Sequence, residues 1–381
     1  MPSTLDRDVA SLLCVGFHGL TPSDEVLELI RRGVSGVILF SRNVESAEQV
    51  AALSAALKRA AGRPLLVAID QEGGRVARLR APQGFTELPP MRAIGAVGDD
   101  RLAFEVGALL GRELRAVGID QDYAPVVDVD TNPANPVIGD RSFSADPAVA
   151  GRLGAALALG LQAEGVAACA KHFPGHGDTS QDSHVDLPRL PHSLERLRRV
   201  ELLPFRALAQ AGVAAVMTAH VVFEPLDARR PATLSPAVMR LLREELGFQG
   251  CCVSDDLEMR AVAEHFPLEE AAPGAVAAGV DQLLVCHRAD LQHRAIDLVR
   301  TAVEEGRIPG DRLAEARARV ARLLKFAGPP PDLASVRSKL RTPAHLELAE
   351  GLPRQGAGAD PTSAVSLSPT GGEARRKALP D

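Results

Sequence analysis

The sequence predicts an α/β fold, a closed (β/α)8 TIM barrel in a single domain with a disordered C-terminal tail. Short β-rich runs recur along the chain, segments with helical periodicity lie between them, and nearly every run ends in polar residues. The eight runs are SLLCVGF near Cys14, SGVILF ending at Phe40, PLLVAID ending at Asp70, IDQDYAPVVDV around Tyr123, VAACAKH ending at His172, AAVMTAH ending at His220, GCCVSDD ending at Asp256 and DQLLVCH ending at His287.

Helical spacing between the runs implies βα units and therefore a parallel sheet. The expected helices include 46–61, 100–117, 147–165, 193–210, 236–246 and 268–279. An open doubly wound sheet and a closed barrel both fit this alternation, but the presence of eight strands favours the barrel.

The polar residues that follow the runs carry acids, bases and imidazoles. They are His18, Ser41, Arg42, Asp70, Glu72, Asp128, Lys171, His172, His220, Asp255 and His287. Because the carboxyl ends of all barrel strands open onto one face, we expect this set to converge in one mouth.

The end of the chain differs in composition from the rest. From about Gly328 the segment GPPPD leads to an expected short helix at 343–349, and a stretch rich in Gly, Ser and Pro follows. We expect one domain over 1–350 and a disordered tail over 351–381.

Charge and hydropathy exclude several classes of protein. The 381-residue chain has a formal net charge of −6 with acids and bases mixed, so nucleic acid is not an expected partner. The start, MPSTLDRDVASLLCVG, lacks a secretory h-region, and no stretch approaches the roughly 20 apolar residues of a membrane span. We expect a cytoplasmic protein with no membrane partner. Five cysteines lie in apolar runs without C-x-x-C spacing, which indicates neither disulfides nor zinc.

The loop KHFPGHGDTSQDSH, from Lys171 onwards, is the densest group of titratable residues. His172 and His176 have the i, i+4 spacing of a zinc-binding helix. Pro174 and Gly175 lie between them and prevent that helix, so no metal is expected.

Asp182 and His184 close the same loop and lie two residues apart. In an extended loop both side chains project to one side, so the carboxylate can orient and polarise the imidazole. A histidine held in this way is a candidate general acid and base near neutral pH.

Two adjacent acids, Asp255 and Asp256, follow a buried strand in VSDDLEM. Adjacent residues at a strand end point to opposite sides, so we expect only one to face the mouth. One is a candidate nucleophile and the other is expected to brace a helix start or loop. Position alone does not choose between them.

Two further segments suit a polyhydroxylated ligand. In AIDQEGGRVARLR, Asp70 ends a strand and three arginines, Arg78 among them, follow a Gly-Gly turn. A carboxylate and a guanidinium can hold hydroxyl groups by paired hydrogen bonds. The rigid loop NPANPVIGDRSF directs Arg141 towards the same mouth.

Four motifs together are specific: DQEGGRVARL, DYAPVVDVDTNPANPVIGDRSF, AKHFPGHGDTSQDSH and SDDLEM, in this order. They resemble the bacterial β-N-acetylhexosaminidases of glycoside hydrolase family 3, over roughly residues 15–324. The resemblance implies a (β/α)8 catalytic domain and a retaining mechanism. It implies Asp255 as the nucleophile and His184, assisted by Asp182, as the acid/base. It implies that the sugar is bound by Asp70, Arg78, Arg141, Lys171 and His172.

By the same resemblance, the expected substrate is a muropeptide in which terminal β-1,4-linked N-acetylglucosamine precedes 1,6-anhydro-N-acetylmuramic acid. Its cleavage belongs to cell-wall recycling. We expect a monomer that needs no cofactor. Alternatives within the family are a phosphorylase, because a neutral imidazole eases attack by anions, and another family 3 β-glycosidase. Alternatives of a different class are a non-catalytic sugar-binding barrel and a lyase with a Schiff base on Lys171.

Overall fold

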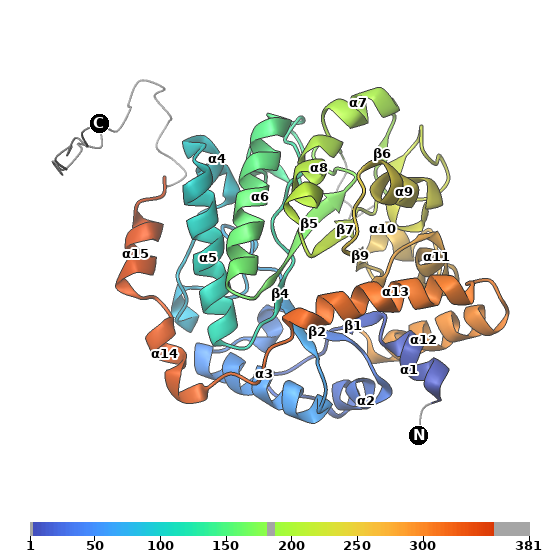
Figure 1. Ribbon diagram of the computed structural model, residues 1–381, viewed down its shortest axis with the longest axis horizontal. Helices are drawn as coiled ribbons and strands as arrows, with labels where there is room; N and C mark the ends of the chain where they lie inside the picture. Colours follow the sequence, from blue (N-terminus) through green and yellow to red (C-terminus); the bar gives the residue numbers. More distant parts are fainter. Residues whose placement is uncertain (1–2, 181–186, 354–381) are drawn as a thin grey trace, which may run out of the picture.

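A closed barrel of eight parallel strands forms the centre of the molecule in the computed structural model, which describes residues 3–180 and 187–353 (Figure 1). The strands are β1 Leu13–Val15, β2 Gly36–Leu39, β3 Leu66–Ile69, β4 Gln121–Asp122, β5 Ala167–Phe173, β7 Ala215–Thr218, β9 Cys251–Asp256 and β10 Gln282–Val285. Strand β1 pairs with β2 on one side and with β10 on the other, which closes the barrel. The predicted (β/α)8 barrel and all eight predicted strands are confirmed.

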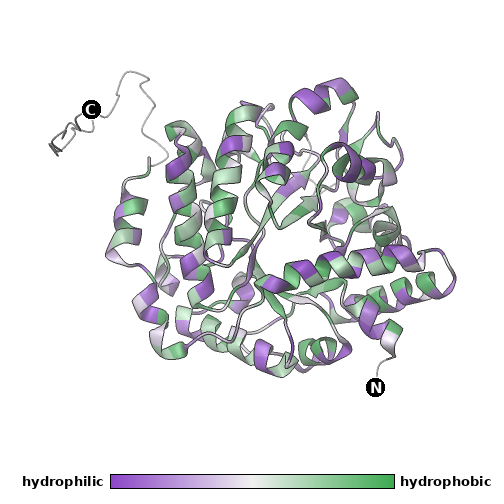
Figure 2. Cartoon of the chain, viewed as in Figure 1, coloured by the Kyte–Doolittle hydropathy of each residue, from purple (hydrophilic) through white to green (hydrophobic). Residues whose placement is uncertain are grey.

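Helices surround the barrel, and four expected helices are present within a residue or two of their predicted bounds. These are α3 Ala47–Ala61, α5 Asp100–Ala116, α6 Pro147–Ala163 and α11 Leu268–Ala278. The others are α1 Thr4–Ala10, α2 Asp24–Arg32, α4 Met91–Val97, α7 Leu194–Arg199, α8 Leu202–Ala211, α9 Pro236–Arg240, α10 Arg260–Ala263, α12 Ala289–Glu304, α13 Gly310–Leu323, α14 Val336–Lys339 and α15 Pro343–Glu350. Figure 2 shows hydrophilic and hydrophobic segments alternating along these helices, as amphipathic helices require.

Local sequence explains where the helices begin and end. The Ser46 hydroxyl accepts a hydrogen bond from the Gln49 N–H at the start of α3, and Gly62 ends that helix with a φ of 59°. The single helix predicted over 193–210 is wrong, because it is divided between α7 and α8. Pro204 accounts for the break, since a proline ring clashes with the carbonyl four residues earlier, here that of Val200.

Two further details differ from the prediction. The helix expected over 236–246 is α-helical only as α9 and continues as a π-helix, Leu241–Glu245. A small parallel sheet, β6 Arg189–Leu190 with β8 Val222–Phe223, was not predicted, because two-residue strands leave no periodicity to detect.

The short helix expected at 343–349 is confirmed as α15. Most of the predicted tail lies outside the described residues.

Buried ion pairs anchor the amino ends of two strands. Asp120 precedes β4 and Asp281 precedes β10, and both side chains are fully buried. The cations paired with them are Lys58 and Arg115 for Asp120, and Arg243, Arg312 and Arg319 for Asp281. Charges at this end of a barrel hold the fold together, whereas those at the opposite end are available for a site.

Within the described ranges, no helix is both long and apolar enough to cross a membrane.

Helices α5 and α6 approach each other through glycines. A Cβ added at Gly107 would lie 2.1 Å from the carbonyl oxygen of Leu157. We expect Gly107→Ala to lower the free energy of unfolding by about 1–3 kcal/mol, because overpacking against a backbone outweighs the gain in helix propensity. Urea titration measures this. Gly310→Ala, where nothing lies within 4 Å, is the control, and an equal loss in both variants would contradict the explanation.

Candidate active site

A pocket of about 210 Å³ opens at the carboxyl ends of the strands. One part of its lining is charged or polar: Asp70, Glu72, Arg78, Arg141, Lys171, His172, His176, Asp255, Asp256 and His287. The other part is largely apolar: Ile38, Phe40, Val76, Val137, Met217, Met259, Leu284 and Cys286. A small pocket with many convergent polar groups suits a compact polar ligand.

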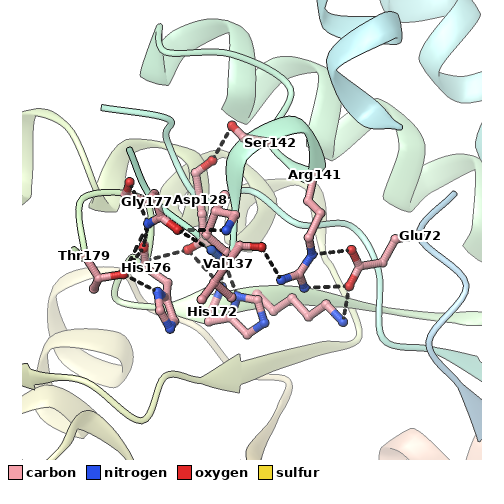
Figure 3. Close-up of polar contacts among 12 residues, drawn as sticks. Glu72, Asp128, Val137, Arg141, Ser142, His172, His176, Gly177 and Thr179 are labelled. Atoms are coloured by element: carbon pink, nitrogen blue, oxygen red, sulfur yellow. Dashed lines mark hydrogen bonds and ion pairs between the residues drawn. The ribbon is translucent and has the colours of Figure 1, made fainter. Parts of the chain in front are cut away.

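Five charged side chains of the pocket lining form a connected network. The Nζ of Lys171 lies 2.9 Å from Oδ1 of Asp70 and 2.6 Å from Oε1 of Glu72. Arg141 donates two hydrogen bonds to Glu72, each of 2.8 Å (Figure 3). Arg78 contacts the second oxygen of Asp70 at 3.3 Å. The network therefore holds each side chain in one orientation before any ligand arrives.

The electrostatics of this network favour the charged forms. Burial alone would raise the pKa of Glu72, but Arg141 and Lys171 outweigh it and hold the pKa well below its usual range. Burial alone would lower the pKa of Lys171, but Asp70 and Glu72 outweigh it and raise the pKa. Lys171 is therefore an ammonium ion at neutral pH.

Asp128 organises the loop that follows β5. Its carboxylate accepts hydrogen bonds from the backbone N–H groups of His172, at 3.1 Å, and His176, at 2.7 Å. Its Oδ2 lies 2.7 Å from Nδ1 of His172 (Figure 3). Asn135 holds the next part of the loop, since its side-chain N–H donates to the carbonyls of His176 and Gly177. Two segments far apart in the sequence thus fix the polar wall of the pocket.

Asp255 and Asp256 both line the pocket, so the expectation that only one would face the mouth is wrong. The pairing between β9 and β10 shifts register at this point, and such an irregularity disrupts the alternation of side chains. The two carboxylates nevertheless differ. Asp256 accepts hydrogen bonds from the N–H groups of Glu258 and Cys286, both at 3.2 Å, and pairs with His287 at 3.1 Å. It braces the loop, as expected for one of the pair.

The Asp255 carboxylate has fewer interaction partners than that of Asp256. Within the described part of the chain, its one hydrogen bond comes from the N–H of Asp256, at 2.8 Å. Burial would raise the pKa of Asp255, but His220 and His172 outweigh burial and lower it. His220 is itself fixed by Thr233 and by the carbonyl of Asp256, both at 2.9 Å. Asp255 is therefore an ionised carboxylate that faces the pocket and accepts a single hydrogen bond from the described residues.

His176 gives the fold a pH dependence. Burial and the neighbouring His172 lower the pKa of His176 to about 4. Between pH 6.5 and about 4 the unfolded chain binds a proton that the folded chain excludes. The free energy of unfolding should therefore fall by up to about 3 kcal/mol as the pH falls through this window. The lowered pKa of Glu72 adds to the loss from about pH 4.5 downwards and that of Asp255 from about pH 3.8 downwards, because below these ordinary values the unfolded chain binds a proton that the folded chain does not.

Urea titrations at several pH values measure this loss of stability. His176→Asn should show a smaller loss between pH 6.5 and 4 than the wild type. The same slope in both proteins would show that another group is responsible.

The structure brings together most of the predicted site residues. Asp70, Arg78, Arg141, Lys171, His172 and Asp255 all line the pocket. Asp182 and His184 lie outside the described residues. The predicted convergence of every strand-end residue is too broad. His18 and Ser41 are exposed and do not line the pocket, and Arg42 donates instead to the carbonyls of Phe17 and Cys286.

Four polar pocket residues were given no binding or catalytic role by the motifs: Glu72, His176, Asp256 and His287. Glu72 and His287 were expected only as strand-end residues of the mouth, and Asp256 only as a brace. Glu72 had a usable signal, because it lies two residues after Asp70 and an extended chain turns both to the same side. Within the described residues, no group of three or more His, Cys, Asp or Glu is arranged to hold a metal ion.

Comparison with known proteins gives a consistent result. The family model described as "Glycosyl hydrolase family 3 N terminal domain" matches residues 4–323. A beta-hexosaminidase from Thiobacillus denitrificans is 42% identical over 334 residues, which cover 86% of this chain and 89% of that protein. A beta-hexosaminidase from Bordetella parapertussis is 40% identical over 313 residues, 80% of this chain and 86% of that protein.

Solved structures agree. A glycoside hydrolase family 3 beta-N-acetylglucosaminidase from Paenibacillus sp. str. FPU-7 has a TM-score of 0.88 and 45% identity, covering 91% of this chain and 68% of that one. NagZ from Neisseria gonorrhoeae, in complex with N-trifluoroacetyl-D-glucosamine, has a TM-score of 0.76 and 34% identity, covering 89% and 96%. The matched residues include every described part of the pocket, and the chain therefore belongs to glycoside hydrolase family 3.

Proposed function

We propose that this family 3 enzyme is a retaining β-N-acetylhexosaminidase that removes terminal β-linked N-acetylglucosamine. The observation that carries the proposal is Asp255, a half-buried, ionised carboxylate that faces the pocket with a single hydrogen bond among the described residues. A carboxylate in this state suits nucleophilic attack on an anomeric carbon. The relatives named beta-hexosaminidase support the sugar that we assign.

The proposed reaction has two displacements. Asp255 attacks the anomeric carbon, the bond to the leaving oxygen breaks, and a glycosyl-enzyme forms. His184, assisted by Asp182, donates a proton to the leaving oxygen. It then takes a proton from the water that attacks the same carbon and releases Asp255. These two roles follow from the sequence motif, because both residues lie outside the described part of the chain.

The remaining predicted residues bind the sugar in this proposal. Asp70 accepts hydrogen bonds from hydroxyl groups, and Arg78, Arg141, Lys171 and His172 surround the ring. Since the ion pairs among them already exist, binding costs little reorganisation. The apolar wall, with Phe40 and Met217, covers the less polar faces of the ring.

We propose residues 1–350 as the catalytic domain and a muropeptide in the cytoplasm as the natural substrate. The expected disaccharide unit is N-acetylglucosamine linked to 1,6-anhydro-N-acetylmuramic acid, as released in cell-wall recycling. The four sequence motifs support this choice. We expect the enzyme to release N-acetylglucosamine from that disaccharide and to hydrolyse a β-glucoside only slowly. Fast hydrolysis of the β-glucoside would instead indicate another family 3 β-glycosidase.

Leaving-group dependence tests the role of His184. With an aryl β-N-acetylglucosaminide whose phenol leaves without protonation, His184→Ala should lose far less activity than with a disaccharide. The difference should be on the order of 10²-fold, the usual contribution of general acid catalysis. Steady-state kinetics on both substrates measure it, with rates of the first displacement taken from burst experiments. Equal losses on both substrates would contradict an acid role.

Two alternatives remain open to direct experiment. A phosphorylase would yield a sugar 1-phosphate in phosphate buffer, which mass spectrometry of the products detects. A lyase with a Schiff base on Lys171 requires a neutral amine, whereas the pKa of Lys171 is raised by Asp70 and Glu72. Borohydride trapping on Lys171 would overturn our assignment, and tight sugar binding without turnover would indicate a binding protein.

A further inference from the structure

The hydrogen bonds of Asp128 determine the state of His172. Asp128 is 1% exposed, and its two oxygens receive the N–H groups of His172 and His176 and face Nδ1 of His172. A carboxylate accepts hydrogen bonds and donates none when ionised. Burial would raise the pKa of Asp128, but His172 and His176 outweigh burial and lower it, so the ionised form is the relevant one.

It follows that Nδ1 of His172 carries a proton. In a neutral imidazole only one nitrogen is protonated, so the other, Nε2, has a free lone pair. Among residues 3–180 and 187–353, no hydrogen bond reaches that nitrogen. His172 lines the pocket, and its ring lies edge-on to His176, with centroids 5.7 Å apart. The ring cannot turn without breaking the bond to Asp128.

We propose that Asp128 is a positioning residue: it keeps a proton on Nδ1 of His172, so that Nε2 is the nitrogen that accepts a hydrogen bond from one hydroxyl of the bound sugar. The identity of the ligand rests on the proposed function, whereas the position of the proton does not. Asp128 itself does not line the pocket, so in this proposal it acts through His172.

Asp128→Asn tests the proposal with little change of shape. The amide oxygen can still accept from the backbone N–H groups of His172 and His176, which leaves the NH₂ group facing Nδ1. Because NH₂ only donates, Nδ1 must become the acceptor and the proton moves to Nε2. Asp130→Asn is the matched control, since Asp130 lies in the same segment and pairs with Arg92 instead of His172.

¹⁵N NMR of histidine-labelled protein shows directly which ring nitrogen carries the proton. The spectra are recorded at a pH about 2 units above the ordinary histidine pKa. His172 is assigned by comparison with His172→Gln. The wild type and Asp130→Asn should show a protonated Nδ1 and a pyridine-type Nε2, and Asp128→Asn should show the reverse. A protonated Nε2 in the wild type overturns the proposal, even if the Asn variant does not fold.

Binding of fluorinated sugars tests whether Nε2 of His172 accepts a hydrogen bond from a sugar hydroxyl. N-acetylglucosamine derivatives with fluorine in place of the 3-, 4- or 6-hydroxyl are titrated by calorimetry. Fluorine cannot donate, so one of them should bind the wild type about 10-fold more weakly than the parent sugar. In Asp128→Asn that ratio should shrink towards one, and in Asp130→Asn it should persist. An unchanged ratio in folded Asp128→Asn overturns the proposal. If no N-acetylglucosamine derivative binds the wild type, the proposed function fails and the NMR result alone decides the position of the proton.

Discussion

Replacing Asp255 by alanine should lower kcat on an aryl β-N-acetylglucosaminide by at least about 10⁴-fold, the scale expected when a nucleophile is lost. The reason is geometric. The Asp255 carboxylate faces the pocket, and Asp256 beside it is occupied by two N–H groups and His287. Asp256 is therefore not free to replace it. Release of the phenol measures the loss.

Added azide separates loss of a nucleophile from loss of structure. In Asp255→Ala a small anion can enter the vacated space and attack the anomeric carbon, which should restore phenol release and yield an α-glycosyl azide. Asp256→Asn is the control, and azide should not rescue it. Full activity of Asp255→Ala without azide would refute the nucleophile assignment.

Replacing Glu72 by glutamine should lower the free energy of unfolding by about 3–5 kcal/mol, because it leaves two buried cations without their shared anion. Glu72 is 2% exposed and pairs with both Arg141 and Lys171. Denaturant titration measures the loss. The pKa of Lys171 should fall at the same time, since Glu72 contributes to raising it.

The matched control is Glu105→Gln on α5. Glu105 pairs with Arg101, and both side chains are well exposed, so the change should cost less than about 1 kcal/mol. A comparable loss in the two variants would show that the burial of the Glu72 network does not matter.

The sequence predicts the barrel well because its strands are buried on both sides. Strands such as Gly36–Leu39 and Leu66–Ile69 are continuous apolar runs, and each is followed by residues with a different character. Details that depend on single residues were less accessible. Pro204 divides one predicted helix, and an irregular register at β9 turns both Asp255 and Asp256 towards the pocket.

The connections between site residues were beyond sequence reasoning. Motifs identified Asp70, Arg141 and His172 one at a time. The pair between Glu72 and Arg141 joins residues 69 apart, and that between Asp128 and His172 joins residues 44 apart. Such contacts depend on how loops from different strands lie together, which no local pattern encodes. The pairing of Asp182 with His184 stays a prediction, because both residues lie outside the described part of the chain.

The ion pairs at the amino ends of the strands also bear on how the chain is made. Asp281 precedes the last strand, yet two of its three arginine partners, Arg312 and Arg319, lie on α13. Of the described partners, a nascent chain still lacking α13 retains Arg243 and the N–H of Cys252 to offset that carboxylate. The closed barrel therefore reaches its full stability only after residues 310–323 have left the ribosome, when nearly the whole family 3 domain has been synthesised.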